Sequence, residues 1–161
     1  ILGDPTAKHK IIEYTNYTCI HCYNFHINKY PALKTKYLDT KIASYEVRLL
    51  TDPALAIATY CGQAQGKGEE MYDYIFKQHT ALLALLEKKG DPPIEDYARS
   101  VGLDLEQFRA CQKDSRWSDL SDQLSSAATK DKVEGTPTFL IDGIIATGDL
   151  PLAAFDTVLG Q

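Results

Sequence analysis

The chain has 161 residues, of which 44% are hydrophobic and 24% are charged, a composition typical of one globular domain with room for an insertion. Its net charge of −5 at pH 7 argues against nucleic acid or an anionic membrane surface as the main partner. The richest apolar run, residues 81–86, is too short to span a bilayer.

The first third of the chain predicts a strand, a helix and a second strand. Residues 2–6 are rich in turn formers, and the apolar run after them predicts a strand over residues 10–16. Alternation over residues 42–50 predicts the second strand. Between them, residues 23–38 predict a helix, kinked by a proline, whose buried face comprises Tyr23, Ile27, Tyr30, Leu33 and Tyr37.

The middle of the chain indicates helices throughout. Asp52 and Pro53 open a helix that runs to about Gln65, and shorter helices follow over residues 94–101 and after a capping box at Asp104. A last helix carries Trp117, Leu120, Leu124 and Ala128. Ahead of these, one long helix is expected to align seven residues on a single face, namely Tyr72, Ile75, Phe76, His79, Leu82, Leu83 and Leu86.

Strand signals return near the end of the chain. Residues 136–141 predict a strand, Asp142-Gly143 predicts a hairpin turn and residues 144–147 predict the returning strand, before a terminal helix opened by Pro151. Because the helical segment enters and leaves between strands, we predict an α/β fold with an inserted helical domain. The predicted domains are 1–51 with 133–161, and 52–132.

Cys19 and Cys22 form a Cys-x-x-Cys pair at the first strand-to-helix junction. Cys19 lies near the helix N-terminus, where free backbone N–H groups and the helix dipole stabilise a thiolate. Such a pair predicts thiol–disulfide exchange, with Cys19 as the attacked or leaving sulfur and Cys22 as its partner. His21 between them would favour the Cys19 thiolate and make the disulfide more oxidising. Ile20 is a supporting residue to which we assign no chemical role.

A structural disulfide and half of a zinc site are the alternatives for this pair. A complete zinc site needs a second pair of ligands at a similar spacing. His26 could supply one ligand, but Cys61 and Cys111 lie far away in the sequence, in the predicted helical domain. We therefore favour redox chemistry and expect neither a metal nor another cofactor.

Two motifs resemble those of a known family. One is the strand, Cys-x-x-Cys and helix unit with histidine before the second cysteine, and the other is Gly135-Thr136-Pro137-Thr138 before the late strand. Both are similar to motifs of the DsbA family of bacterial thiol:disulfide oxidoreductases, and residues 17–26 especially resemble its α-proteobacterial branch. The resemblance covers nearly the whole chain and implies a thioredoxin-like fold with an inserted helical domain. Ile20 departs from it, because many members have proline there.

The resemblance also implies roles for three other residues. In the family, the proline matching Pro137 is cis beside the redox pair, and substrate pairs with the backbone of the residue matching Thr136 by strand addition. A plain turn proline is the alternative. Glu13, six residues before Cys19, matches a buried acid that could take and release a proton during exchange. A solvent-facing strand residue is the alternative there, and the lysine that often partners the acid falls at Ser44.

The remaining cysteines, Cys61 and Cys111, bring the total to four, and an even number fits an oxidising compartment. The residues alone leave open two buried free thiols or a disulfide. A disulfide closing a loop of about 50 residues would stabilise the fold by about 4 kcal/mol. The resemblance to the α-proteobacterial branch favours this structural disulfide.

The resemblance finally implies a periplasmic enzyme, a dithiol oxidase that donates its Cys19–Cys22 disulfide to reduced, unfolded secreted proteins. A membrane partner resembling DsbB would reoxidise it, and we expect a monomer. The chain begins with Ile1 and shows no charged region followed by an apolar one, so we expect a removed signal or anchor, or a trimmed sequence. A disulfide reductase or isomerase on the same scaffold is the alternative, and a zinc-binding module is a remote one.

Overall fold

The computed structural model describes residues 2–160. The chain divides into two compact units, of which unit 1 comprises residues 1–49 and 126–161 and unit 2 comprises residues 50–125. The second boundary falls inside helix α8 (Leu120–Lys130), so the last turn of that helix belongs to unit 1. No helix within the described residues combines the length and the apolar composition needed to cross a membrane.

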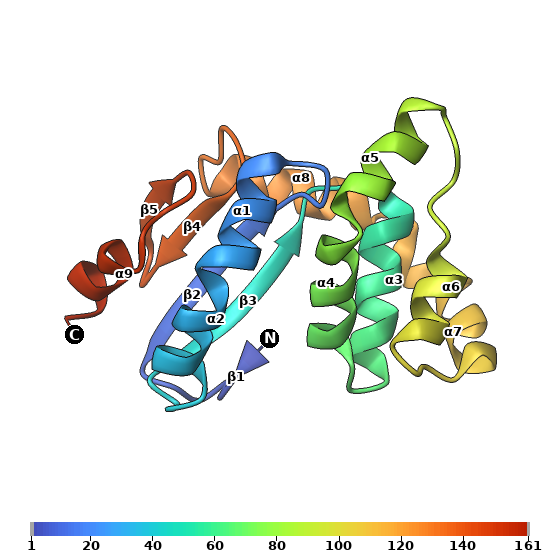
Figure 1. Ribbon diagram of the computed structural model, residues 1–161. Coiled ribbons are helices and arrows are strands. Elements are labelled where there is room, and N and C mark those ends of the chain that lie inside the picture. The colour runs from blue at the N-terminus through green and yellow to red at the C-terminus, as the bar shows by residue number, and fades with distance from the viewer. Residues whose placement is uncertain (1, 161) are drawn as a thin grey trace. The chain divides into compact units, whose positions relative to one another are not determined.

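Unit 1 is built on a mixed sheet, which within residues 2–160 has the strand order β1-β3-β2-β4-β5 (Figure 1). The central strand β2 pairs parallel with β3 and antiparallel with β4, and the two outer pairings are antiparallel. The chain therefore leaves β2 from the middle of the sheet. The strands are β1 (Leu2–Gly3), β2 (His9–Thr15), β3 (Ala43–Leu49), β4 (Thr138–Ile141) and β5 (Ile144–Thr147).

Four of these strands confirm the predictions, with ends that differ by at most two residues. The fifth, β1, corrects the expectation that residues 2–6 are only a turn-rich lead-in, because Leu2 and Gly3 pair with β3. Two residues are too few for alternation to be visible in a sequence. The predicted hairpin turn is confirmed, with positive φ at both Asp142 and Gly143 as a type I′ turn requires.

The helix predicted over residues 23–38 is divided into α1 (Ile20–Asn28), α2 (Tyr30–Leu33) and η1 (Lys34–Leu38). The break comes at Lys29, with φ −126°, and places Pro31 in the first turn of α2, where its missing N–H costs nothing. Because the break changes the helical phase, the predicted buried face was partly wrong. Tyr23 and Ile27 are only partly buried, whereas Phe25 and His26 are buried.

Helices α1 and α9 (Leu152–Leu159) pack on the same face of the sheet. Phe25 of α1 lies 4.7 Å from Phe139 of β4 between ring centroids, and Phe155 of α9 lies 5.1 Å from Phe139 and 6.0 Å from Phe25. All three rings are buried, and such aromatic pairs each contribute about 0.5–1.5 kcal/mol beyond the burial of their area. This cluster anchors the helix that carries the cysteine pair.

The opposite face of the sheet carries a polar cluster. Tyr14 Oη donates to Asp131 Oδ2 at 2.5 Å, and one Arg48 Nη donates to both Tyr14 Oη at 2.6 Å and Asp131 Oδ2 at 3.0 Å. Side chains alternate along a strand, so Tyr14 and its neighbour Glu13 point to opposite faces. The cluster fixes the chain just after α8, ahead of the return to β4.

Unit 2 is helical. The predicted caps are confirmed, because Asp52 accepts from Ala54 N at 2.9 Å and Asp104 accepts from Gln107 N at 2.8 Å. The capping box at Asp104 is half formed, since Asp104 N donates to Gln65 Oε1 in place of Gln107. The single long helix with a seven-residue apolar face was wrong, since it breaks at Gln78 and Leu83 is 41% exposed. Apolar spacing continues across a break without marking it. The helices are α3 (Pro53–Ala64), α4 (Gly68–Lys77), α5 (His79–Glu87), α6 (Ile94–Ser100), α7 (Leu105–Gln112) and η2 (Ser115–Trp117), followed by the start of α8.

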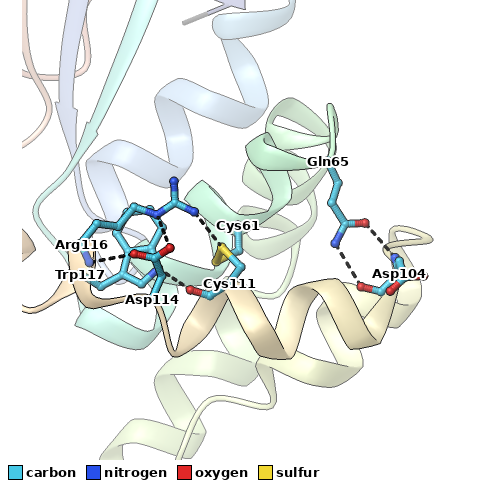
Figure 2. The surroundings of a disulfide bond; sticks show 7 residues. All are labelled: Cys61, Gln65, Asp104, Cys111, Asp114, Arg116 and Trp117. Carbon is cyan, nitrogen blue, oxygen red and sulfur yellow. Dashed lines mark hydrogen bonds and ion pairs between the residues drawn. A yellow bond between two sulfur atoms is a disulfide. The ribbon is translucent and has the colours of Figure 1, made fainter.

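A disulfide joins α3 to α7. Cys61 and Cys111 are bonded, with their Cα atoms 5.8 Å apart, and they enclose a sequence separation of 50 residues (Figure 2). A second link joins the same helices, because Gln65 Nε2 donates to Asp104 O at 3.0 Å and Asp104 N donates to Gln65 Oε1 at 2.8 Å. The expected bridge is present, and a pair of hydrogen bonds accompanies it.

Candidate redox site

The cysteine pair sits where β2 passes into α1. Cys19 is the N-cap of the helix, with extended backbone angles, and its sulfur accepts a hydrogen bond from Cys22 N at 3.5 Å. The preceding turn is held by Asn16, whose side-chain oxygen accepts from Thr18 N at 3.0 Å. The predicted junction is therefore confirmed, and Cys19 occupies the position at which helix N–H groups lack backbone partners.

The Thr136-Pro137 segment lies against this pair. The Thr136–Pro137 peptide bond is cis, as the resemblance implied, and Cys19 Sγ lies 3.4 Å from Thr136 O, to which the thiol donates. Pro137 is buried, and its carbonyl accepts from Gly148 N at 2.8 Å. The fold thus brings together two motifs that are 117 residues apart in the sequence.

The two thiols of the pair have opposite protonation behaviour. Burial raises the pKa of Cys19, but hydrogen bonds from the Thr136 side chain, from Cys22 and from the His21 backbone N–H outweigh it, so the pKa lies below the ordinary value of 9.0. Burial raises the pKa of Cys22 to about 12, against weaker opposing hydrogen bonds. Cys19 is partly exposed and Cys22 is 1% exposed. Cys19 is therefore the sulfur suited to act as a thiolate.

The two residues between the cysteines point outward. Ile20 is 52% exposed and His21 is exposed. His21 acts on Cys19 through its backbone N–H. A role for its imidazole remains a prediction.

Glu13 is buried, with 1% exposure, which excludes the solvent-facing alternative. Its partner is a residue that the sequence reasoning missed, because Tyr45 Oη donates to Glu13 Oε2. Ser44, at the expected position of the partner lysine, lies on the other face of β3 and donates to His9 O at 3.5 Å. The parallel register, with Ile11 opposite Tyr45 and Glu13 opposite Val47, places Tyr45 on the face of Glu13.

Tyr45 belongs to a buried group of side chains within electrostatic reach of Cys22. The Tyr30 ring lies 5.4 Å from the Tyr45 ring, and His26 stacks on Tyr30 at 5.1 Å. Burial raises the pKa of Tyr45 well above 10.0, and Glu13, Tyr30 and Cys22 raise it further. Tyr45 therefore remains protonated and acts as a hydrogen-bond donor.

The other two cysteines take no part in this group, because Cys61 and Cys111 are bonded to each other in unit 2. Across residues 2–160, no cluster of three or more His, Cys, Asp or Glu side chains is placed to hold a metal ion. The chemistry visible in unit 1 is that of two thiols, one with a lowered and one with a raised pKa, and a buried carboxyl group on the strand that leads to them.

Comparison with known proteins shows which family has this fold. A family profile described as Thioredoxin matches residues 1–161. The chain belongs to the thioredoxin family. Within that family it is similar to Wolbachia pipientis alpha-DsbA1, whose crystal structure has a TM-score of 0.79 and 25% identity over 99% of this chain and 87% of that chain. BdbD of Bacillus subtilis, at 13% identity, shares the fold with a TM-score of 0.77 over 99% of this chain and 92% of that chain.

Sequence relatives agree with the structural ones. A Rickettsia bellii protein named as a protein-disulfide oxidoreductase is 27% identical over 149 residues, which is 89% of this chain and 57% of that protein. A Rickettsia typhi protein of the same name is 28% identical over 152 residues, which is 89% of this chain and 54% of that protein. The chain thus spans about half the length of these relatives. The predicted DsbA resemblance and the thioredoxin-like fold with a helical insertion are confirmed.

Proposed function

We propose that this thioredoxin-family chain is a thiol–disulfide oxidoreductase that donates the Cys19–Cys22 disulfide to reduced protein substrates. The observation that carries the proposal is the difference in pKa between the two thiols, because the pKa of Cys19 lies below 9.0 and that of Cys22 is about 12. A stabilised Cys19 thiolate favours the reduced form, and that makes the disulfide form a stronger oxidant.

The reaction begins when a substrate thiolate attacks Cys19 Sγ of the oxidised pair. The Cys19–Cys22 bond breaks, a mixed disulfide forms between the substrate and Cys19, and Cys22 leaves with the bonding electrons. A thiol whose pKa is about 12 is a poor leaving group as a thiolate, so it needs a proton. The Glu13 carboxyl group, buried on the strand that leads to the pair, is the proposed donor.

A second substrate thiolate then attacks the substrate sulfur of the mixed disulfide. The new substrate disulfide forms and Cys19 departs as the stabilised thiolate. The substrate has lost two electrons and the Cys19–Cys22 pair has gained them. His21 supports the thiolate through its backbone N–H, and we include its imidazole in the proposed catalytic group with Cys19 and Cys22.

Substrate binding is proposed at the backbone beside Pro137, which has no N–H to close a strand ladder. Strand addition at Thr136 makes few demands on side chains, which suits reduced, unfolded secreted proteins as substrates. This chemistry needs an oxidising compartment, so we propose that the protein acts in the periplasm. We further propose that it is a monomer and that a membrane partner resembling DsbB reoxidises the Cys19–Cys22 pair.

The reduction potential of the Cys19–Cys22 pair tests the function. The protein is equilibrated with glutathione buffers, and mass spectrometry of alkylated peptides separates this pair from Cys61–Cys111. We expect a potential closer to the value of about −120 mV for DsbA than to the value of about −270 mV for thioredoxin. A value near that of thioredoxin would instead favour a reductase or isomerase.

Oxidation of a reduced two-cysteine peptide by the oxidised protein gives the direct assay. We expect rapid, stoichiometric transfer of one disulfide. The absence of transfer by a protein whose Cys19–Cys22 pair is shown to be oxidised would contradict the proposal.

A further inference from the structure

Glu13, the buried acid on the strand that leads to the pair, has an uncharged partner. A positively charged lysine often partners this acid in the resembled family, but here Ser44 stands at that position and the neutral Tyr45 makes the contact instead. Both groups are withdrawn from water, because Tyr45 is 0% and Glu13 is 1% exposed. Burial of a carboxylate is unfavourable unless a donor satisfies it, so the Tyr45 hydroxyl matters to the state of Glu13.

The Tyr45 hydroxyl keeps its proton at neutral pH and is therefore a hydrogen-bond donor. Burial and the neighbouring Glu13 raise the pKa of Tyr45 well above 10.0. The hydroxyl therefore donates to Glu13 without giving its own proton away. A hydrogen bond to a carboxylate stabilises the charged form and fixes the orientation of the oxygen that accepts it.

The surroundings of Tyr45 hold it in place. Its ring lies against Tyr30, which in turn stacks on His26 of α1, and the electrostatic influence of Cys22 reaches Tyr45 as well. The titratable groups around the Tyr45–Glu13 pair are Cys22 of α1 and Tyr30 of α2, which both raise the pKa of Tyr45, and His26 of α1, which stacks on Tyr30. Tyr45 donates a hydrogen bond to Glu13 Oε2 itself.

We propose that Tyr45 is the positioning residue for proton transfer between Glu13 and Cys22, an inference that rests on the function proposed above. Its hydroxyl donates to Glu13 Oε2 and so fixes the orientation of the carboxyl group that exchanges the proton. When the disulfide opens, Glu13 passes its proton to Cys22 Sγ, and the resulting carboxylate is stabilised by Tyr45. The proton returns to Glu13 when the disulfide closes.

The test compares Tyr45→Phe with Glu13→Gln, with the double variant and with a matched control. Tyr45→Phe keeps the ring against Tyr30 and deletes only the hydroxyl. Tyr37→Phe is the control, because Tyr37 is also 0% exposed and its hydroxyl also donates to a carboxylate, Asp156 of α9, in the same unit. Each protein is oxidised, and the rate constant for oxidation of a two-cysteine peptide is measured against pH.

General acid–base catalysis contributes roughly 10²–10⁴-fold, so we expect Glu13→Gln to lose about a hundredfold in rate and Tyr45→Phe to lose about tenfold. Because Tyr45 acts through Glu13, the double variant should be no slower than Glu13→Gln alone. An ionisation in the pH–rate profile should be absent in Glu13→Gln and displaced in Tyr45→Phe. The profile of Tyr37→Phe should superpose on that of the natural protein.

Melting temperatures show whether each variant is folded, since a purely structural role would lower stability in Tyr45→Phe and Tyr37→Phe alike. A Tyr45→Phe profile that superposes on the natural one, or rate losses that multiply in the double variant, would overturn the inference while the proposed function stands. A natural protein that transfers no disulfide would overturn both.

Discussion

The chain has two pairs of cysteines, one suited to thiol–disulfide exchange and the other linking two helices. Cys19 and Cys22 lie within one turn at the start of α1 as free thiols, whereas Cys61 and Cys111 are bridged between two helices. At the N-cap, unpaired backbone N–H groups stabilise a sulfur anion, while within a helix those groups already bond to carbonyls. The position of a cysteine in its helix therefore separates a reactive pair from a structural one.

The largest expected effect is on exchange activity. Cys19→Ser removes the attacked sulfur, and loss of a nucleophile that acts with its partners costs on the order of a thousandfold or more in rate. The matched variant Cys61→Ser/Cys111→Ser removes the two bonded sulfurs of the disulfide without touching unit 1. We expect it to retain peptide oxidation within about twofold, and a comparable loss in both variants would break the contrast between the pairs.

Stability should follow the opposite pattern. Removal of the Cys61–Cys111 bridge, which closes 50 residues, should lower the free energy of unfolding by about 4 kcal/mol in the chain-entropy model. Urea unfolding of Cys61→Ala/Cys111→Ala against the bridged protein measures this. The control in unit 1 compares Cys19→Ala/Cys22→Ala with the natural protein in which Cys19 and Cys22 are reduced. If this variant lost as much free energy of unfolding as the variant without the bridge, the Cys61–Cys111 pair would not be distinguished as the structural one.

The stability of the dithiol form should depend on pH in opposite directions for Cys19 and Cys22. Because the pKa of folded Cys19 is below 9.0, this thiol contributes stability that is complete above 9.0 and is lost as pH falls through the lowered pKa. The raised pKa of Cys22 acts in the reverse direction, with stability lost as pH rises from 9.0 towards 12.

Urea midpoints of the natural protein and Cys19→Ser, both with Cys22 reduced, measure the Cys19 contribution by difference. The difference should grow with pH up to 9.0 and then level off. Iodoacetamide should modify Cys19 well before Cys22 at neutral pH. Equal rates for the two thiols, or a difference that shrinks with rising pH, would show that the sulfurs are not distinguished as described.

The smallest expected effect concerns the hydrogen bonds that accompany the bridge. Gln65→Ala deletes both bonds to the Asp104 backbone, and hydrogen bonds of this kind contribute about 1 kcal/mol. Gln63→Ala, exposed on the same helix, is the control. We expect urea unfolding to show a loss of about 1 kcal/mol for the first and close to none for the second. Equal losses would mean that the contact adds nothing to the covalent link.

Local sequence signals predicted much of this molecule. The Asp104 cap and the Asp142-Gly143 turn depend on neighbouring residues, so their chemistry is visible in the sequence. The position of Cys19 follows in the same way, from an apolar run on one side and helical spacing on the other. The cis bond before Pro137 was expected from family resemblance, because no local pattern specifies it.

Features that depend on distant segments were harder to predict. The bond between Tyr45 and Glu13 joins residues 32 apart, and it depends on which residues of two parallel strands face each other. A shift of one residue would have placed Ser44 there instead. The break at Gln78 was missed, because apolar spacing persists on either side of it. The kink expected from Pro31 is present as a break at Lys29, two residues earlier.

The outer strands of the sheet determine how easily an unfolded chain could pair with the backbone of this protein. An exposed strand edge is a template onto which a foreign chain can add, and a long one invites aggregation. Within residues 2–160 the edge strands are β1, with 2 residues, and β5, with 4. Edges this short provide few unpaired backbone groups, so an unfolded chain can form few hydrogen bonds there. An oxidoreductase that acts on unfolded chains would therefore be less prone to aggregate with them through its sheet edges.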